Sequence, residues 1–307
     1  MMPVRIQIIS CALFVTILLT TFQVSAQNLF VSYDAEIDEI TPSQTQSTFA
    51  SGLYPPGWLA FDSSGDLFES TTFGNNIYEF SPSGNKSAFA TGLNNPNGLA
   101  FDNAGNLFEA DGGSGNIFEY VNNDGTLSFT PTLFASRLND PDGLAFDGAG
   151  NLFVANDGNG SITKITPNGI ESTFATGLAE PTGLAFNSAG NLFEADNGSL
   201  SINEFTPDGT ETHFASVLSG VGFPNVEGLA FDTGGDLYAA GAGSGIIYKF
   251  SPSGQESGFN TSSMFLNWGL AFQNKSLPVP EPSVLGLVGV GAGAVLVYRK
   301  RSRNVEL

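Results

Sequence analysis

The side chains of this chain that could do chemistry stand at a variable position beside a repeated motif. Leu-Ala-Phe occurs six times, and the residue two places before each copy differs: Gly57, Asn97, Asp142, Thr182, Glu227 and Trp268. Residues that vary while their surroundings repeat are candidates for a binding site. Carboxylate and amide oxygens suit Ca²⁺ or another hard cation, so a divalent cation is the candidate cofactor.

A second variable position follows a companion motif, Asn/Asp-Leu-Phe/Tyr. It is occupied, in chain order, by Tyr33, Thr71, Asp111, Asn156, Asp196 and Gly241. We predict that the two positions border one ligand site, lined by Asn97, Asp142, Glu227, Asp111, Asn156, Asp196 and Trp268. The alternative is that Asn, Asp and Pro residues next to glycine only form turns.

The chain lacks the residues that histidine-dependent or thiol-dependent catalysis would need. The only histidine, His213, is expected on an outer strand, and the only cysteine, Cys11, lies near the N-terminus. Ser-His-Asp and Cys-His arrangements are therefore excluded. A pair of carboxylates of the glycosidase type stays open, and we assign no catalytic residue.

The repeats define the elements that must position these side chains. Successive Leu-Ala-Phe motifs are 40, 45, 40, 45 and 41 residues apart, the range of a four-stranded propeller blade. In one copy, strands are expected at 98–101, 107–110 and 116–120, with a fourth strand after a turn around Gly125.

The repeats are offset by half a unit. They begin with the companion motif at Asn28 and end with Leu-Ala-Phe at Leu270. Strands at 28–30, 36–40 and 47–50 would therefore share a blade with a strand at 268–272, and this pairing would close a ring. We predict an all-β fold: a six-bladed β-propeller over residues 27–275, with four-stranded blades and one blade shared by the N- and C-terminal strands.

The charge of the chain is strongly negative. The chain has 30 acidic and 10 basic residues. Residues 27–275 contain 28 of the acidic residues and 5 of the basic ones, which gives this part a net charge of −23. Such a surface repels nucleic acid and anionic lipid, so nucleic-acid binding is excluded.

Both ends carry sorting signals. Residues 1–26 combine Arg5, an apolar run and a small-residue end, the pattern of a secretory signal peptide. Residues 276–307 contain Pro280, Glu281 and Pro282, then a short apolar run and a basic end. This order resembles the PEP-CTERM sorting signal, which implies an exosortase-type processing enzyme as a partner. We expect an exported protein, at the cell surface or outside the cell, held in the membrane only by its C-terminal span before processing.

The repeats resemble NHL repeats and the six-bladed gluconolactonase-like group, the senescence-marker-protein family. In that family the metal ligands include a Glu-Gly, a Pro-Asn-Gly and a Pro-Asp-Gly at the starts of first strands. The matching residues here are Glu227, Asn97 and Asp142. The resemblance therefore implies a divalent-cation site made by these three residues. A further family asparagine has no match in the copy that begins with Pro55, Pro56 and Gly57.

Two functions follow from these observations. We expect a non-enzymatic binding or scaffold protein, whose ligand is extracellular polysaccharide or a small molecule. The alternative is a metal-dependent hydrolase of the gluconolactonase type, with a divalent cation at the mouth of the propeller.

Overall fold

The computed structural model describes residues 27–216, 225–241, 245–259 and 267–273. Contacts divide the chain into two units, Met1–Lys275 and Ser276–Leu307, and only the first contains described residues. The predicted signal peptide at 1–26, the sorting motif at 280–282 and the side chain of Trp268 lie outside what is described. Within the described ranges, no helix is long and apolar enough to cross a membrane.

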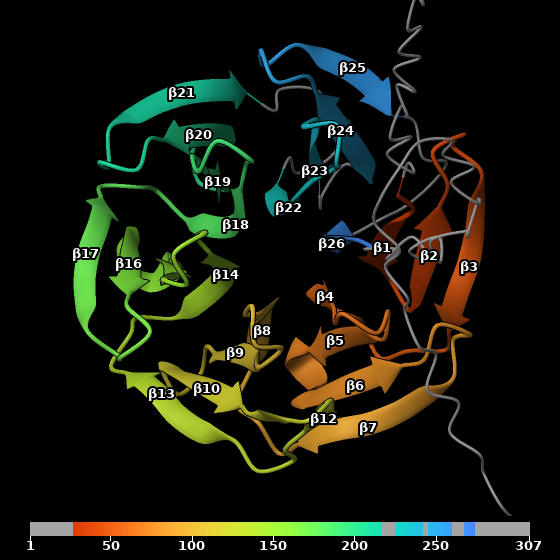
Figure 1. Cartoon of the computed structure of the whole chain (residues 1–307). Coiled ribbons are helices and arrows are strands. Elements are labelled where there is room, and N and C mark those ends of the chain that lie inside the picture. Colours follow the sequence, from red (N-terminus) through yellow and green to blue (C-terminus); the bar gives the residue numbers. More distant parts are fainter. Residues whose placement is uncertain (1–26, 217–224, 242–244, 260–266, 274–307) are drawn as a thin grey trace, which may run out of the picture. The chain divides into compact units, whose positions relative to one another are not determined.

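Six four-stranded antiparallel sheets form the blades of a propeller (Figure 1). Blade 1 consists, in sheet order, of β26 (Asn267–Phe272), β1 (Leu29–Tyr33), β2 (Glu36–Ile40) and β3 (Gln46–Ser51). Blade 2 consists of β4 (Leu59–Phe61), β5 (Leu67–Thr71), β6 (Asn76–Phe80) and β7 (Lys86–Thr91). Blade 3 consists of β8 (Pro96–Phe101), β9 (Leu107–Asp111), β10 (Asn116–Tyr120) and β13 (Thr132–Ser136). Blade 4 consists of β14 (Pro141–Phe146), β15 (Leu152–Asn156), β16 (Ser161–Ile165) and β17 (Glu171–Thr176). Blade 5 consists of β18 (Pro181–Phe186), β19 (Leu192–Asp196), β20 (Ser201–Phe205) and β21 (Glu211–Ser216). Blade 6 consists of β22 (Val226–Phe231), β23 (Leu237–Gly241), β24 (Ile246–Phe250) and β25 (Glu256–Phe259).

Blade 1 joins strands from both ends of the propeller. β1 pairs with β2 on one side and with β26 on the other, where Leu29 lies opposite Phe272 and Val31 lies opposite Leu270. In Figure 1 the blue strand β26 accordingly lies beside the red strand β1. The predicted six-bladed, all-β propeller is confirmed, and so is its closure by this pairing.

Blade 3 differs from the prediction in one connection. A simple turn is expected around Gly125, but β11 (Asn122–Asn123) and β12 (Thr126–Leu127) pair there as a separate hairpin. Gly125 has a φ of +89°, and its backbone N–H donates to Oδ1 of Asn122 at 2.8 Å. The hairpin lengthens the repeat without changing the four-stranded blade.

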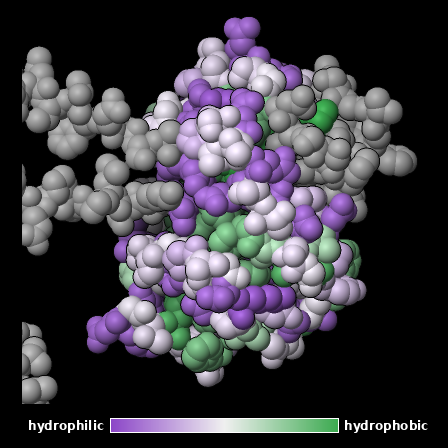
Figure 2. Space-filling view, turned by 90° about the vertical axis from the view of Figure 1, so that its right-hand side faces the viewer, coloured by the Kyte–Doolittle hydropathy of each residue, from purple (hydrophilic) through white to green (hydrophobic). Residues whose placement is uncertain are grey.

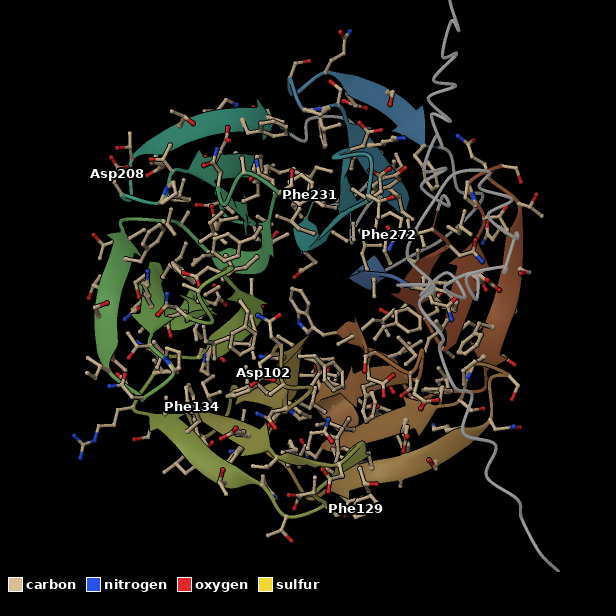
Figure 3. The ribbon with its side chains drawn as sticks, in the orientation of Figure 1. Asp102, Phe129, Phe134, Asp208, Phe231 and Phe272 are labelled. Carbon is tan, nitrogen blue, oxygen red and sulfur yellow. The ribbon has the colours of Figure 1, made fainter. Side chains whose placement is uncertain are left out.

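Aromatic triads between blades explain why the motifs repeat. Phe153 of β15 packs edge-on against Phe174 of its own blade, with ring centroids 4.9 Å apart. It also packs against Phe186 of the next blade at 5.0 Å. Equivalent triads at the other five blade boundaries are centred on Phe30, Phe68, Phe108, Phe193 and Tyr238. Figure 3 labels three residues that pack against these central rings, namely Phe134, Phe231 and Phe272. Each such pair contributes about 0.5–1.5 kcal/mol beyond the burial of apolar area.

The outermost strands present polar residues to solvent and turn one aromatic residue inward. β7 exposes Lys86 and Ser87 and buries Phe89. The side of the molecule at the right of Figure 1 correspondingly shows mostly hydrophilic and neutral surface, interrupted by hydrophobic patches (Figure 2).

Aspartate side chains hold the turns between first and second strands. In blade 3, Oδ1 of Asp102 accepts hydrogen bonds from the backbone N–H groups of Ala104 at 2.9 Å and Asn106 at 2.8 Å. Gly105 completes the turn with a φ of +81°. The sequence predicts a structural role for this turn, and these bonds are such a role.

We expect Asp102→Ala to lower the free energy of unfolding by about 1–2 kcal/mol, because two backbone N–H groups lose a charged acceptor. Denaturant unfolding measures this loss. The comparison is Asp208→Ala, where an exposed aspartate of another turn accepts one backbone N–H, from Thr210 at 3.1 Å, and the Thr206 hydroxyl, so the loss should be smaller (both aspartates are labelled in Figure 3). Equal losses in the two variants would contradict the role of Asp102.

Candidate functional site

Glycines in the first strands let neighbouring blades meet at the axis. A Cβ atom added at Gly98 would lie 2.3 Å from the backbone oxygen of Asp142, and one at Gly183 would lie 2.1 Å from that of Glu227. No side chain fits at such distances, so glycine is required for this close approach. The packing gathers the variable residues before these glycines at one end of the axis, which we call the mouth.

Asn97 is held beside Asp142 by hydrogen bonds. Its Nδ2 donates to the carbonyl oxygen of Pro141, the residue before Asp142, at 3.2 Å. Its Oδ1 accepts from Oγ1 of Thr72 at 3.3 Å. These bonds fix the amide plane and leave Oδ1 with a second lone pair that could ligate a cation.

Thr182 links the next two blades in the same way. Its Oγ1 donates to the carbonyl oxygen of Val226, the residue before Glu227, at 2.9 Å, and to that of Ala195 at 3.1 Å. Thr182 is 4% exposed and Glu227 is 8% exposed. Blades 3 to 6 therefore contribute one row of variable residues, in the order Asn97, Asp142, Thr182 and Glu227.

Asp142 and Glu227 form an electrostatically strained pair at the mouth. Burial and then the charges of Asp142, Asp157 and Glu180 raise the pKa of Glu227 to about 8. Burial and the charges of Asp157 and Asp140 raise the pKa of Asp142 to about 7, against a lowering hydrogen bond from Trp58. The neighbouring charges that act on the pair are thus all negative, an arrangement that a bound cation would relieve.

Three of these carboxylates are absent from the residues predicted from the sequence. Asp157 begins the short helix η2 (Asp157–Asn159), and Asp140 and Glu180 lie in the connections that lead into β14 and β18. Each lies within two residues of a variable position. A search that included the flanking loop residues would have found them.

Trp58 reaches across the mouth. It precedes β4 in blade 2, and hydrogen bonding by its side chain lowers the pKa of Asp142 in blade 4, against the effects of burial and of neighbouring charges. Its backbone is fixed by Ser70, because the Trp58 N–H donates to Oγ of Ser70 at 3.1 Å and the Trp58 carbonyl accepts from the Ser70 N–H at 3.0 Å. The sequence offers no signal for this contact, because it joins two blades that are not neighbours.

Two predicted ligand-binding residues, Asp111 and Asp196, make hydrogen bonds to loops. Asp111 accepts from the backbone N–H groups of Asn94 at 2.8 Å and Ser114 at 3.1 Å. Asp196 accepts from those of Ala179 and Ser199, both at 2.8 Å. Both carboxylates therefore position mouth-side loops, and a direct contact of either with a ligand stays a prediction.

Asn156 and Trp268 complete the predicted set. Asn156 is 1% exposed, and its Nδ2 donates to Oγ1 of Thr163 at 3.0 Å. Its Oδ1 is buried without a hydrogen-bond partner among the described residues. Only the backbone of Trp268 is described, as part of β26.

The donor set suits a hard cation in type. Asn97, Asp142 and Glu227 supply an amide oxygen and two carboxylates, the ligands that Ca²⁺ and similar cations prefer. Over the ranges that the structure covers, no three His, Cys, Asp or Glu side chains meet in an arrangement that could hold a metal ion. A cation at the mouth would therefore depend on the Asn97 oxygen and on solvent or substrate oxygens for its remaining ligands.

His213 lies away from the mouth residues. It is an exposed residue of β21, the outermost strand of blade 5, and its Nε2 lies 3.0 Å from Oγ of Ser216. This position matches the expected outer strand. The histidine is therefore no partner for the carboxylates at the mouth.

Comparisons with known proteins agree with the fold and add a family match. Residues 61–187 match the family model described as SMP-30/Gluconolactonase/LRE-like region, a range that includes Asn97 and Asp142. No curated protein matches the sequence.

Three solved structures illustrate the shared fold. A chain of the nidogen/laminin complex is 18% identical, with a TM-score of 0.70 over 80% of this chain and 98% of that one. A gluconolactonase from Xanthomonas campestris is 20% identical, with a TM-score of 0.60 over 76% and 88%. An inactive variant of virginiamycin B lyase from Staphylococcus aureus, solved with quinupristin, is 15% identical, with a TM-score of 0.59 over 82% and 94%. Likeness at these identities shows the propeller fold alone.

The family match corrects the function expected from the sequence. The expected non-enzymatic binding or scaffold protein is wrong, because the matched model describes gluconolactonase-type proteins and favours the alternative. Propellers carry many unrelated functions, so the fold alone favours no activity, and residues such as Asn97 and Asp142 before glycine also fit simple turns.

Proposed function

We propose that this protein is a metal-dependent hydrolase of the lactonase type, with a divalent cation held by Asn97, Asp142 and Glu227. One observation carries the proposal: a buried glutamate, Glu227, lies within the field of the Asp142 carboxylate at the mouth, and further carboxylates surround both. Holding both carboxyl groups in their charged form in this site is costly unless a cation binds near them. The match of residues 61–187 to a gluconolactonase-type model supports the same reaction class.

A cation bound at these residues would polarise the carbonyl of a lactone and make a nucleophile of water at neutral pH. The protein's own groups do the rest. Asn97 is fixed by its bonds to Pro141 and Thr72, so its oxygen needs no reorientation. Because the pKa of Asp142 is about 7 without a cation, its carboxylate is available as a ligand at neutral pH, and the proton of the attacking water passes to the leaving alkoxide oxygen or to solvent. Water then adds to the carbonyl carbon, the ring C–O bond breaks, and the released alkoxide oxygen takes up a proton.

The test is a titration of the purified chain with Ca²⁺, Mn²⁺ and Zn²⁺ by calorimetry, together with thermal unfolding with and without a chelator. We expect binding of at least one cation and a melting temperature that rises by several degrees with it, because a ligand that binds only the folded state stabilises it. Proton release from a lactone should require the same cation. Absence of binding, with melting unchanged by chelator, would refute the cation site.

We further propose export of the protein and processing of its C-terminal segment by an exosortase-type enzyme. The supporting features are the apolar leader at 1–26 and the order of Pro280-Glu281-Pro282, apolar run and basic end. Mass spectrometry of the protein from its native cells tests this proposal. The expected mature chain begins after Ala26 and lacks the basic end, whereas an intact chain inside the cell would contradict both steps.

A further inference from the structure

Aromatic side chains gather on the mouth side of blade 2. Tyr54 is 58% exposed and Phe73 is 64% exposed, and both belong to the small number of large apolar side chains that are exposed in the described part of the chain. Tyr54 lies in the connection from β3 to β4, and Phe73 lies in the short helix η1 (Thr72–Gly74) that follows β5. Because β4 begins and the antiparallel β5 ends at the mouth, both residues lie at that end of the blade.

Trp58 extends this aromatic surface to the candidate cation site. Its indole N–H bonds to the carboxylate of Asp142, so its ring lies between blade 2 and blade 4. Pro55, Pro56 and Gly57, the residues that precede it, line a small hollow together with Thr72 and Phe73. Trp58 is therefore the residue of blade 2 that links the neighbourhood of this hollow with the candidate cation site at Asp142.

The mouth consequently has two chemically different sectors. Blades 4 to 6 supply carboxylates, namely Asp142, Asp140, Asp157, Glu180 and Glu227. Blade 2 supplies Gly57 at its variable position, which has no side chain to bond to a substrate hydroxyl, and aromatic rings around it. A substrate that reacts at the carboxylate sector must place its remaining part against the aromatic sector.

We propose that the substrate is an uncharged lactone with an apolar ring or alkyl chain, and that Trp58, Tyr54 and Phe73 bind this apolar part. The proposal rests on the hydrolase function proposed above. The carboxylates of the mouth disfavour anionic lactones, since like charges repel in a site of low dielectric. The aromatic rings favour an apolar group, because binding buries its surface. For the several hydroxyl groups of a sugar lactone, these three side chains offer only the Tyr54 hydroxyl and the Trp58 indole N–H, which is engaged by Asp142.

The experiment compares δ-decalactone, which carries an alkyl chain, with glucono-δ-lactone, which carries hydroxyl groups, using proton release by the cation-loaded full chain. We expect kcat/KM to be at least about tenfold higher for δ-decalactone. Relative to Trp58→Phe, which also lacks the indole N–H, Trp58→Ala should lower kcat/KM for δ-decalactone by about tenfold or more, mainly through KM, and change that for glucono-δ-lactone much less. Trp58→Phe, which keeps an aromatic ring and removes the N–H, should retain most of the preference for the alkyl lactone.

A double variant, Tyr54→Ala with Phe73→Ala, should lower the same preference, and Phe129→Ala is the matched control because Phe129 is exposed on another blade connection. Preference for glucono-δ-lactone, or an equal loss on both substrates in Trp58→Ala relative to Trp58→Phe, would overturn this inference and leave the hydrolase intact. Hydrolysis of neither lactone by a chain that binds its cation would overturn the proposed hydrolase and this inference with it.

Discussion

Glu227→Gln is expected to abolish turnover, with a loss of about 10³-fold or more in kcat/KM. The substitution keeps the shape of the side chain and removes one of the two carboxylates in the proposed ligand set. Cation affinity depends steeply on the number of charged ligands, so we expect binding to weaken by about 100-fold or more. Calorimetric titration and lactone hydrolysis, measured on the same preparation, give the two numbers.

The same variant separates a functional role from a structural one. Burial and the charge of Asp142 raise the pKa of Glu227 to about 8, so above that pH the unliganded protein must hold a charge that its surroundings disfavour. Glu227→Gln should therefore unfold at the same or a higher temperature than the original chain when no cation is present, despite its loss of activity. A variant that is inactive because it is misfolded would show the opposite.

The matched control is Glu194→Gln. Glu194 is 0% exposed, and burial raises its pKa to about 8, but it bonds to Asn203 within blade 5 and belongs to neither variable position. We expect its cation affinity and turnover to stay near those of the original chain. If Glu227→Gln binds cation as tightly as Glu194→Gln does, the assignment of Glu227 as a ligand is wrong.

The fold could be predicted from the sequence because each residue of the repeated motifs makes the same packing contact in every blade. The Phe of Leu-Ala-Phe and the Phe or Tyr of the companion motif meet in the same triad at every blade boundary, as Phe153 and Phe186 do. The half-unit offset then requires that β1 and β26 share a blade. Blade 3 shows the limit, because the extra hairpin around Gly125 lies in a connection where nothing repeats.

The site was predictable only in part, for a related reason. Comparison of the repeats finds positions on the first and second strands, and Asn97, Asp142 and Glu227 are predicted from these positions. Asp157 lies in a loop, and the Trp58 to Asp142 bond joins blades that are not adjacent. Contacts of that kind depend on the closed ring and have no periodic signal in the sequence.

The third position of the second strand shows a different limit. It holds Glu69, Glu109 and Glu194 in three blades and Val31, Val154 and Ala239 in the others, and all three glutamates are 0% exposed. From the sequence alone, a position that holds Glu, Val or Ala is predicted to be half-exposed to solvent. Glu69 accepts from Oγ1 of Thr71 at 2.8 Å, whereas both carboxylate oxygens of Glu109 are buried without a partner among the described residues.

Glu109→Gln is therefore expected to stabilise the protein at neutral and alkaline pH. Burial and the charge of Asp111 raise the pKa of Glu109 from its ordinary 4.5 to about 9. The folded chain then holds a proton that the unfolded chain releases above pH 4.5. The contribution of Glu109 to stability is fully present below that pH and falls by up to about 1.4 kcal/mol per pH unit until about pH 9.

The measurement is the free energy of unfolding of both chains from pH 5 to pH 9. Because an amide does not ionise, the advantage of Glu109→Gln should grow with pH across this window and reach a few kcal/mol. Glu69→Gln is the control: the pKa of Glu69 is about 7, so any advantage should stop growing near that pH, and the lost bond from Thr71 should oppose it. Parallel stability curves for the original chain and Glu109→Gln would show that Glu109 reaches solvent or a partner, because only a carboxyl group isolated from both keeps its proton to pH 9.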